Sequence, residues 1–334
     1  MRHVRRHHVS VQVARPCIAL IGECLIELNG TPFGTVDQTF GGDSLNTALY
    51  LARLARSRID VQYITAVGAD ALSSGMVQRW QVEGIDTSFV LRDGTRLPGL
   101  YWIQVDETGE RNFLYWRNDS AARRLLKHQD FERVAARVAG VDLIYLTGIS
   151  LAILPEEDRA KLTDLLTKLA ADGVTIVLDT NYRSALWPSE DVARTAISAL
   201  APATDLMFAT FDDERELWGD ETPRMTVARL HRAQARSIVV KLGAAGCLFS
   251  DGATIMPVTT SPVANVVDTT AAGDAFNAGF LSAWLAKHSV ITCCSVGNAL
   301  AHTVIQHRGA IIPAAATPSF DQLLAHCNFE DTPA

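Results

Sequence analysis

The chain has 334 residues, 48% of them hydrophobic and 20% charged, and its formal net charge is −7. These proportions are typical of globular proteins, so we expect a sizeable core and no extensive disorder, and the acidic balance argues against broad binding to nucleic acid or to an anionic membrane. No stretch reaches the roughly 18 apolar residues of a membrane span, and the six cysteines form no C-x-x-C pair, which indicates a cytoplasmic protein with reduced thiols.

The basic N-terminal residues 1–16 lack the apolar stretch of a signal peptide, and we expect them to form a flexible extension. Beyond them, short apolar runs that end in Gly, Asp or Thr alternate with helical patterns, such as the i, i+3, i+4, i+7 spacing from Leu45 to Ala52. The runs are Cys17–Ile21, Val61–Val67, Leu143–Leu146, Val174–Leu178, Leu206–Ala209 and Ile238–Leu242. Continuous apolar runs of this length suit strands that are buried on both faces. The alternation therefore predicts an α/β fold with a mostly parallel sheet flanked by helices.

Two segments break this alternation. Residues 30–40 are turn-rich and not helical, and residues 97–118 have the pattern of a β-hairpin in which Gly109 supplies the turn. The hairpin carries more aromatic residues than a solvated hairpin should: Tyr101, Trp102, Phe113, Tyr115 and Trp116. We expect the two segments to form a small β-sheet that covers a ligand site, meets a partner chain, or does both. The core would then comprise residues 17–29, 41–96 and 119–320, followed by a C-terminal tail at 321–334.

The strongest chemical signal lies in residues 266–276, which read VVDTTAAGDAF. Small residues open a predicted helix there, and Asp274 follows in its first turn. The free N–H groups and the partial positive charge of a helix start bind phosphate when small side chains let it come close. A carboxylate beside that phosphate is placed to accept the proton of an attacking hydroxyl. The alternative is an ordinary helix start with an acidic residue in its first turn.

Three further segments are candidates for a site. The stretch GGDSLNTA at 41–48 has paired glycines for a tight loop, and its Asp43 and Asn46 offer polar groups for sugar hydroxyls. The stretch KLGAAG at 241–246 suits a nucleotide phosphate or ribose at the end of a strand. In DTNYR at 179–183, Arg183 follows a buried strand, where an arginine is a partner for phosphate or carboxylate. Taken alone, the first segment is better explained as a plain loop with a helix cap and Arg183 as a surface arginine, and the glycine-rich segment at 241–246 is a weak signal by itself.

Taken in this order, the motifs resemble those of the ribokinase-like (PfkB) family of carbohydrate kinases, through the GG-x-x-x-N loop at 41–46 and the D-T-x-x-A-G-D-x-F segment at 268–276. The resemblance implies a ribokinase-like fold with a small β-sheet lid over the sugar, ATP as phosphoryl donor, and Mg²⁺. It makes Asp274 the catalytic base, and it makes the backbone amides of Ala271, Ala272 and Gly273 an anion hole. It also implies nucleotide contacts from Asn181, Arg183, Lys241, Gly243, Gly246, Ala271, Gly273 and Asn298.

The chain departs from the family pattern at two places. Ala271 replaces the first glycine of G-A-G-D, and an alanine is unstrained there only if its φ is negative. The family's N-x-x-E segment, which organises Mg²⁺ through water, reads TFDD at 210–213, so Asp213 or the neighbouring Glu214 would take its role. As in some members of the family, a monovalent cation such as K⁺ would bind near Asp268 and Thr270.

Within the family, several stretches resemble the 2-keto-3-deoxygluconate kinases: GECLIEL at 22–28, GGDSLNTA at 41–48, LPGLY at 97–101, DETGER at 106–111, YWR at 115–117 and NYR at 181–183. This branch phosphorylates a small sugar acid to its 6-phosphate, which implies substrate contacts from Gly41, Gly42, Asp43, Asn46, Tyr101, Tyr115, Arg117, Arg183 and Asp274. Because side chains alternate along a strand, Tyr115 and Arg117 should face one pocket, where the arginine would meet the sugar carboxylate.

The resemblance leaves alternatives open. The chain could instead be another kinase of the family, acting on fructose, ribose, tagatose phosphate or a nucleoside, or an inactive sugar-binding regulator on the same fold. The intact Asp274 argues against the regulator. The expected partners are a small-molecule sugar acid and, through the lid, further copies of the chain.

Overall fold

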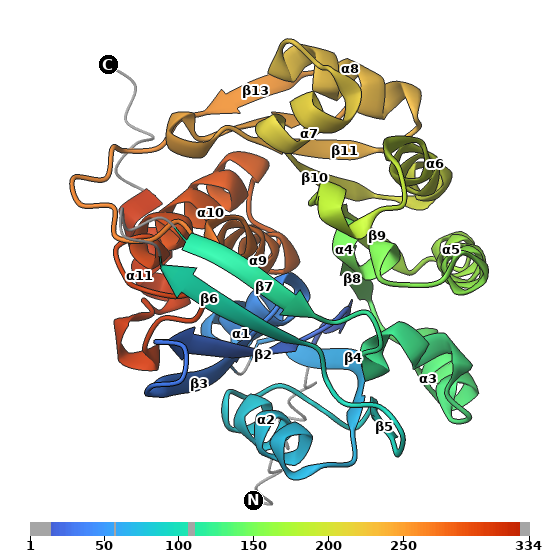
Figure 1. Ribbon diagram of the computed structural model, residues 1–334. Coiled ribbons are helices and arrows are strands. Elements are labelled where there is room, and N and C mark those ends of the chain that lie inside the picture. The colour runs from blue at the N-terminus through green and yellow to red at the C-terminus, as the bar shows by residue number, and fades with distance from the viewer. Residues whose placement is uncertain (1–14, 57, 106–110, 328–334) are drawn as a thin grey trace, which may run out of the picture.

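The structure is a computed structural model, and it describes residues 15–56, 58–105 and 111–327 (Figure 1). The expected N-terminal extension therefore lies outside the described residues up to position 14, and so does Gly109 of the predicted hairpin turn. Everything said below of the architecture concerns the described residues.

A nine-stranded sheet forms the centre of the described chain, in the order β13-β12-β11-β10-β9-β8-β1-β4-β5. Its strands are β1 (Cys17–Ile21), β4 (Asp60–Gly68), β5 (Val90–Asp93), β8 (Leu143–Thr147), β9 (Thr175–Asp179), β10 (Leu206–Thr210), β11 (Ser237–Lys241), β12 (Cys247–Ser250) and β13 (Ile255–Val258). The apolar runs predicted as strands are β1, β4, β8, β9, β10 and β11, which run parallel to one another, so the predicted mostly parallel sheet is confirmed. The antiparallel strands β12 and β13, which were not predicted, extend one edge.

Helices cover both faces of this sheet (Figure 1). One face packs against α1 (Asp43–Ala55), α2 (Ala71–Val82), α9 (Ala272–Leu285), α10 (Val290–Val304) and α11 (Phe320–Cys327). The other packs against α3 (Phe131–Val138), α4 (Gly148–Ala152), α5 (Glu156–Ala171), α6 (Glu190–Leu200), α7 (Phe211–Trp218) and α8 (Pro223–Arg232). Short 3-10 helices lie at Ala121–Lys127, Ser184–Leu186, Ala201–Ala203, Gly243–Ala245 and Ala314–Ala316.

Successive residues of each central strand supply the two cores in turn. In β1, Ile18 and Leu20 are buried in the core under α1 and α9, whereas Ala19 and Ile21 are buried in the core under the helices of the opposite face. Burial on both faces is the reason why these strands are apolar at every position rather than at every second one.

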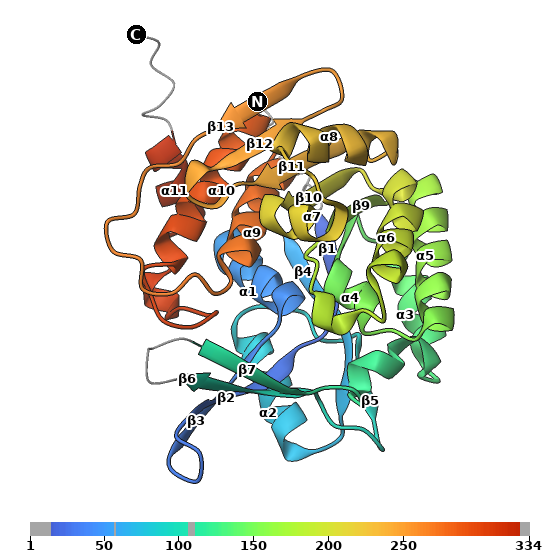
Figure 2. The ribbon, with the colours of Figure 1, turned by 45° about the horizontal axis from the view of Figure 1, so that its top comes forward.

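A second sheet of four strands stands apart from the main one, in the order β3-β2-β6-β7 (Figure 2). Its strands are β2 (Leu25–Gly30), β3 (Val36–Gly41), β6 (Leu100–Val105) and β7 (Arg111–Trp116). The predicted hairpin is present as the antiparallel pair β6–β7, with Tyr101 opposite Tyr115. The sequence pattern placed residues 17–29 in the core, whereas β2 belongs to the small sheet. The reason is that β2 pairs with β3 and β6 and that Leu25 packs with Tyr101 and Ile103, although Ile26 of the same strand is buried in the core under α1.

The C-terminal segment also differs from expectation. The sequence pattern predicts a tail from residue 321, whereas residues 320–327 form α11, which packs against α10 and buries Phe320 and Leu323. The apolar spacing i, i+3 of these two residues accounts for the helix. Four of the cysteines, Cys24, Cys247, Cys293 and Cys294, are buried in the structure.

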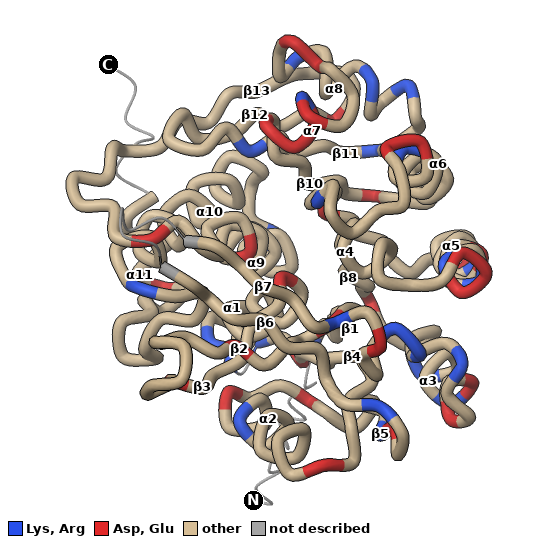
Figure 3. Tube along the Cα trace, viewed as in Figure 1, with Lys and Arg blue, Asp and Glu red and all other residues tan. Residues whose placement is uncertain are grey.

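Charged residues of both signs are interspersed along the outer helices α3, α5 and α6 (Figure 3). They pair locally, as Lys161 does with Glu157 at 2.7 Å on α5 and Arg194 with Glu190 at 2.7 Å on α6, and such exposed pairs add little stability. None of the helices in the described part of the chain is both long enough and apolar enough to cross a membrane.

Candidate active site

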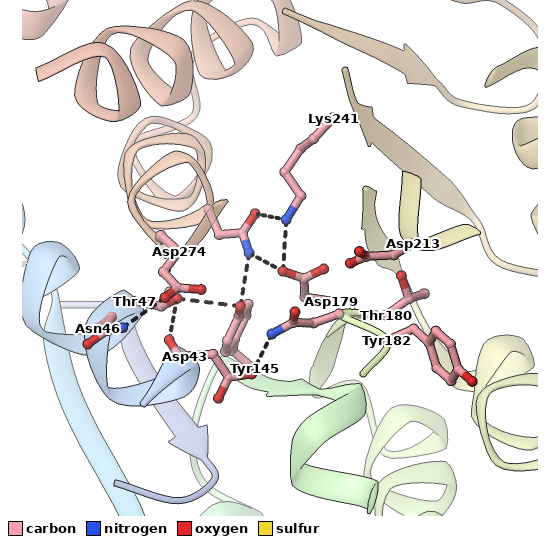
Figure 4. A network of polar contacts seen from close by, with 12 residues as sticks. Asp43, Asn46, Thr47, Tyr145, Asp179, Thr180, Tyr182, Asp213, Lys241 and Asp274 are labelled. Carbon is pink, nitrogen blue, oxygen red and sulfur yellow. Dashed lines mark hydrogen bonds and ion pairs between the residues drawn. The ribbon is translucent and has the colours of Figure 1, made fainter. Parts of the chain in front are cut away.

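The candidate site lies at the carboxyl edge of the main sheet, where strand ends meet the first turns of α1 and α9 (Figures 1 and 4). Strand β9 ends at Asp179 and β11 at Lys241, while α1 begins at Asp43 and α9 at Ala272. Parallel strands present all their carboxyl ends at one edge, so residues that are remote in the sequence meet there. Figure 4 shows the polar side chains that gather at this edge, among them Asp43, Asn46, Asp179, Lys241 and Asp274.

Asp274 is half-buried in the first turn of α9 and faces α1. Its Oδ2 accepts a hydrogen bond of 2.9 Å from the side-chain amide of Asn46, and the hydroxyl of Thr47 donates to its backbone carbonyl at 3.4 Å. Burial, the nearby carboxylate of Asp43 and, more weakly, that of Asp179 raise the pKa of Asp274 to about 7. A carboxyl group with this pKa can take a proton from a hydroxyl and release it again near neutral pH.

Asp43 opens α1 and belongs to the same polar cluster. Its Oδ2 accepts a hydrogen bond of 2.7 Å from the side-chain amide of Asn181, which follows β9. The backbone enters α1 through Gly42, where a Cβ would lie 2.3 Å from the carbonyl oxygen of Glu23, so no other residue fits without a shift of the backbone. The paired glycines Gly41 and Gly42 therefore hold the start of α1 close to the segment that leads into the small sheet.

Lys241 is held in the interior, with 8% of its surface exposed. Its Nζ donates to Oδ2 of Asp179 at 2.8 Å and to Oδ1 of Asn277 at 3.4 Å. Asn277 in turn donates to the same Asp179 oxygen at 2.6 Å and to the hydroxyl of Tyr145 at 3.0 Å. The sequence motifs did not single out Asn277 or Tyr145. The one signal for Asn277 is its position three residues after Asp274, which places both on one face of the helix.

A pocket of about 520 Å³ opens beside the start of α9. The residues expected to contact nucleotide that line it are Lys241, Gly243, Gly246, Gly273 and Asn298, and Ala272 of the expected anion hole lines it too. Apolar walls come from Val263, Val266, Phe276 and Ile305, among others. An apolar pocket with an ammonium group and a helix start at one end suits a ring system that carries an anion. Asn181 and Arg183 lie elsewhere, beside Asp43 and Asp213.

Ala271 precedes α9 with φ of 60° and ψ of 15°, in the left-handed region. The condition for an unstrained alanine is therefore not met, and this conformation costs about 1–2 kcal/mol. The N–H of Ala272 donates to the carbonyl of Thr269 at 3.2 Å, so this amide is not available to the expected anion hole. The amides of Ala271, Gly273 and Asp274 make no hydrogen bond to the described residues, so Ala271 and Gly273 of the expected anion hole stay available to an anion, together with Asp274.

Two buried glutamates, which the motifs did not single out, hold residues expected to contact substrate. Arg117 donates from Nε to Oε2 of Glu23 at 2.9 Å and from Nη2 to the same oxygen, and Tyr101 donates its hydroxyl to Glu27. The guanidinium carbon of Arg117 lies 5.8 Å from the centre of the Tyr115 ring, so the two side chains share one side of the hairpin. Glu23 therefore already neutralises Arg117, whereas the sequence pattern suggested a sugar carboxylate as its counter-charge. The Nη1 group of Arg117 makes no hydrogen bond to the described residues.

The two candidates for a magnesium-binding carboxylate have different surroundings. Glu214 is fully buried, accepts a hydrogen bond from Thr180 and pairs with Arg229 at 2.6 Å, so it fastens α7 to α8. Asp213 pairs with the half-exposed Arg183 at 3.0 Å, and burial raises its pKa while Arg183 offsets part of the rise. Asp213, and not Glu214, is the carboxylate that stands at the site.

Asp268 and Thr270, the residues named for a monovalent cation, organise the loop ahead of α9. Oδ1 of Asp268 accepts from the backbone N–H and the hydroxyl of Thr270 at 3.1 and 2.7 Å, and its Oδ2 accepts from the N–H of Gly309 at 2.6 Å. In the described ranges, no three or more His, Cys, Asp or Glu side chains are grouped to hold a metal ion. A metal ion at this site would need further ligands from a bound phosphate or from water.

Comparison with known proteins extends this description. The sequence matches the pfkB family carbohydrate kinases over residues 16–317. It is 50% identical over 302 residues to a 2-dehydro-3-deoxygluconokinase of Haemophilus influenzae, which covers 90% of this chain and 96% of that protein. It is 43% identical over 306 residues to a 2-dehydro-3-deoxygluconokinase of Escherichia coli K12, covering 90% and 99%. The crystal structure of a PfkB protein from Polaromonas sp. JS666 superposes with a TM-score of 0.77 at 26% identity, over 94% of this chain and 100% of that one.

Proposed function

Because this chain belongs to the pfkB family of carbohydrate kinases, we propose that it transfers a phosphoryl group from ATP to the 6-hydroxyl of 2-dehydro-3-deoxygluconate, also called 2-keto-3-deoxygluconate. The observation that carries the proposal is the position of Asp274. Its carboxylate stands between the polar cluster of α1 and the pocket that Lys241 and Gly273 line. A base in that position can reach a sugar hydroxyl on one side and a nucleotide phosphate on the other.

In the proposed reaction, Asp274 accepts the proton of the 6-hydroxyl as the sugar oxygen attacks the terminal phosphorus of ATP. The new O–P bond forms, the bond from that phosphorus to the bridging oxygen breaks, and ADP leaves. The amides of Gly273 and Asp274 and the ammonium of Lys241 face the oxygens on which negative charge is spread in the transition state. The raised pKa of about 7 makes Asp274 a stronger base than an ordinary carboxylate.

The residues present fit ATP and Mg²⁺. The pocket of about 520 Å³ combines apolar walls for a base with Lys241 and a helix start for phosphates. Asp213 is the carboxylate proposed to hold Mg²⁺ through water, and Arg183 keeps it in place. When bound with ATP, the ion neutralises phosphate charge and so supplies part of the electrostatic catalysis. Asp268 and Thr270 are proposed to lie near a bound K⁺.

For the sugar acid, we assign the carboxylate to two arginines. Arg117 has Nη1 left over from its pairing with Glu23, and Arg183 is half-exposed beside Asp213. Tyr101 and Tyr115 lie on the same side of the hairpin, with ring centres 5.8 Å apart and planes tilted by 37°, and would cover the sugar. Gly41, Gly42, Asp43 and Asn46 would face its hydroxyls from the start of α1.

We also propose that copies of the chain associate through the small sheet. On the side of β7 away from Tyr115, Leu114 is 43% and Trp116 is 58% exposed, which is unusual for large apolar side chains of a monomer. Light scattering on the wild type and on Trp116→Ser tests this association. A monomer at micromolar concentration would count against it.

The function itself is tested by incubating the protein with ATP, Mg²⁺ and 2-dehydro-3-deoxygluconate and identifying the product by ³¹P NMR and mass spectrometry. The expected product is the sugar acid with one phosphate on the 6-oxygen. Formation of ADP without a phosphorylated sugar acid, or no reaction with this sugar while a neutral ketose is phosphorylated, would reject the proposed substrate.

A further inference from the structure

The ammonium group of Lys241 occupies a defined position at the amino end of α9. A Cβ placed on Gly273 would lie 3.3 Å from Nζ, so the ammonium stands directly beside the first turn of this helix. Lysine side chains usually extend their charge into water, whereas this side chain is only 9% exposed. Something in the structure must therefore hold the charge at the helix start.

The side chains of Asp179 and Asn277 hold the ammonium group in this position by accepting hydrogen bonds from it. The ammonium group has three donors, and the described structure uses two of them, toward Oδ2 of Asp179 and Oδ1 of Asn277. The third donor remains for a ligand in the pocket that Lys241 and Gly273 both line. Oδ1 of Asp179 is buried and has no hydrogen-bond partner in the described part of the chain. The ammonium therefore contacts only Oδ2, and Asn277, which donates to the same oxygen, fixes the geometry of the ion pair.

Both polar atoms of the Asn277 side chain, Oδ1 and Nδ2, make hydrogen bonds. Its Nδ2 donates to Asp179 and to the hydroxyl of Tyr145, its Oδ1 accepts from Lys241, and its side chain is fully buried. The amide can make these contacts in only one orientation, because carboxylate and ammonium demand a donor and an acceptor respectively. A buried ion pair of Lys241 and Asp179 alone would not require Asn277, which lies on the same helix as Asp274.

We infer that Asp179 and Asn277 are positioning residues, which hold the Lys241 ammonium where it contacts the phosphoryl group in transfer. The inference rests on the proposed kinase function and assigns two residues to it. Neither residue need touch sugar or nucleotide; each acts through Lys241. A purely structural role predicts instead that their loss affects stability and leaves the lysine's contribution to turnover intact.

A mutant cycle separates the two roles. Lys241→Met combined with Asp179→Asn gives a background in which the pair is neutral and no buried charge is left alone. In the wild-type background, Asn277→Ser should lower kcat about 10- to 100-fold, the usual effect of misplacing a catalytic group by about 1 Å. In the neutral background, the same substitution should change kcat less than about twofold, because its target is gone. Equal losses in both backgrounds, or no loss in the wild type, would overturn the inference.

Ser282→Ala is the matched control, since it removes another buried hydrogen bond of α9, from Ser282 to the carbonyl of Gly279 at 2.7 Å, away from the site. It should leave kcat unchanged. Calorimetric titration gives a second readout that does not depend on turnover. Asn277→Ser should weaken a non-hydrolysable ATP analogue about tenfold more than ADP, and equal weakening of both would contradict the inference. If the wild type phosphorylated no sugar, the proposed function would fail, while this binding ratio would still test the position of Lys241.

Discussion

Asn46 donates its side-chain amide to the carboxylate of Asp274 at 2.9 Å, across 228 residues of sequence. The bond joins the two segments that carry the family signatures, because α1 and α9 pack side by side. It also sets the chemistry of the carboxyl group. The hydrogen bond from Asn46 favours the ionised form, burial and Asp43 favour the protonated form, and the balance leaves the pKa of Asp274 at about 7.

The pH dependence of the reaction should report this balance. Asp274 acts as a base only when ionised, so kcat/KM should rise with pH through about 7 and level off above it. Asp43→Asn removes a neighbouring negative charge and should therefore lower the pKa of Asp274 and move the rise to lower pH, whatever it does to the plateau. The measurement is kcat/KM for the sugar from pH 5 to 9 in both proteins. A rise that stays at the same pH in Asp43→Asn would contradict the proposed coupling.

The left-handed backbone at Ala271 predicts a stabilising substitution. Glycine adopts φ of 60° without the steric cost that alanine carries, so Ala271→Gly should raise the free energy of unfolding by about 0.5–1 kcal/mol after the entropic cost of glycine. Urea unfolding of wild type and variant measures the change. Ala272→Gly is the matched control at the first helical position, where no such strain exists, and it should give no gain. A loss of stability in Ala271→Gly would show that the alanine methyl group contributes packing that outweighs the strain.

The buried pair of Arg117 and Glu23 changes how the arginine must be tested. Arg117→Met alone leaves Glu23 buried without its counter-charge, which should cost about 3–5 kcal/mol of stability. Arg117→Met combined with Glu23→Gln removes both charges and should recover most of that loss. The double variant should still lose about 10- to 150-fold in kcat/KM for the sugar acid, the worth of one charge-assisted contact. Residual activity on neutral ketoses should barely change, and an equal loss on both sugar classes would refute the carboxylate role.

The position of Tyr115 on the small sheet predicts that sugar and nucleotide protect this sheet from hydrogen exchange to different extents. Tyr115 is 53% exposed, and its ring faces the side of the hairpin where the sugar is proposed to bind. Sugar should therefore protect the backbone amides of β6 and β7 from hydrogen exchange more than an ATP analogue does, because closure over the sugar excludes water. Exchange mass spectrometry on the protein with each ligand provides the comparison. Identical exchange with and without sugar would argue against a lid, provided that light scattering shows no interface already covering the hairpin.

Much of the fold could be predicted because its signals are local. The apolar run Leu206–Ala209 reads as a strand without reference to any other part of the chain, and the same holds for the helix start at Asp274. The expectation that residues 17–29 belong to the core is wrong for β2, because a pattern of apolar side chains does not say which neighbour a strand pairs with. Strands β12 and β13 were missed because they are short and lie at an edge of the sheet.

The contacts inside the site could not be predicted in the same way. Lys241 and Asp179 are 62 residues apart, and Asn277 and Asp179 are 98 residues apart, so only the completed sheet brings them within hydrogen-bond distance. The contact between Glu23 and Arg117 is a second example of a long-range interaction that the sequence alone does not reveal. The neutralisation of Arg117 by Glu23 depends on the fold around the hairpin, and the separate stretches at 22–28 and 115–117 do not reveal that the two residues pair.

The most direct test of the account is a steady-state comparison of the wild type with Asp274→Asn on a panel of sugars, with ATP and Mg²⁺ held in excess. The panel should contain keto-deoxy sugar acids and neutral ketoses, and Asp212→Asn, an exposed carboxylate paired with Arg215, serves as the matched control. We expect kcat/KM to be highest for 2-dehydro-3-deoxygluconate, turnover to fall about 10²–10⁴-fold in Asp274→Asn, and Asp212→Asn to behave as the wild type. A neutral ketose as the best substrate, or unchanged turnover in folded Asp274→Asn, would contradict the account.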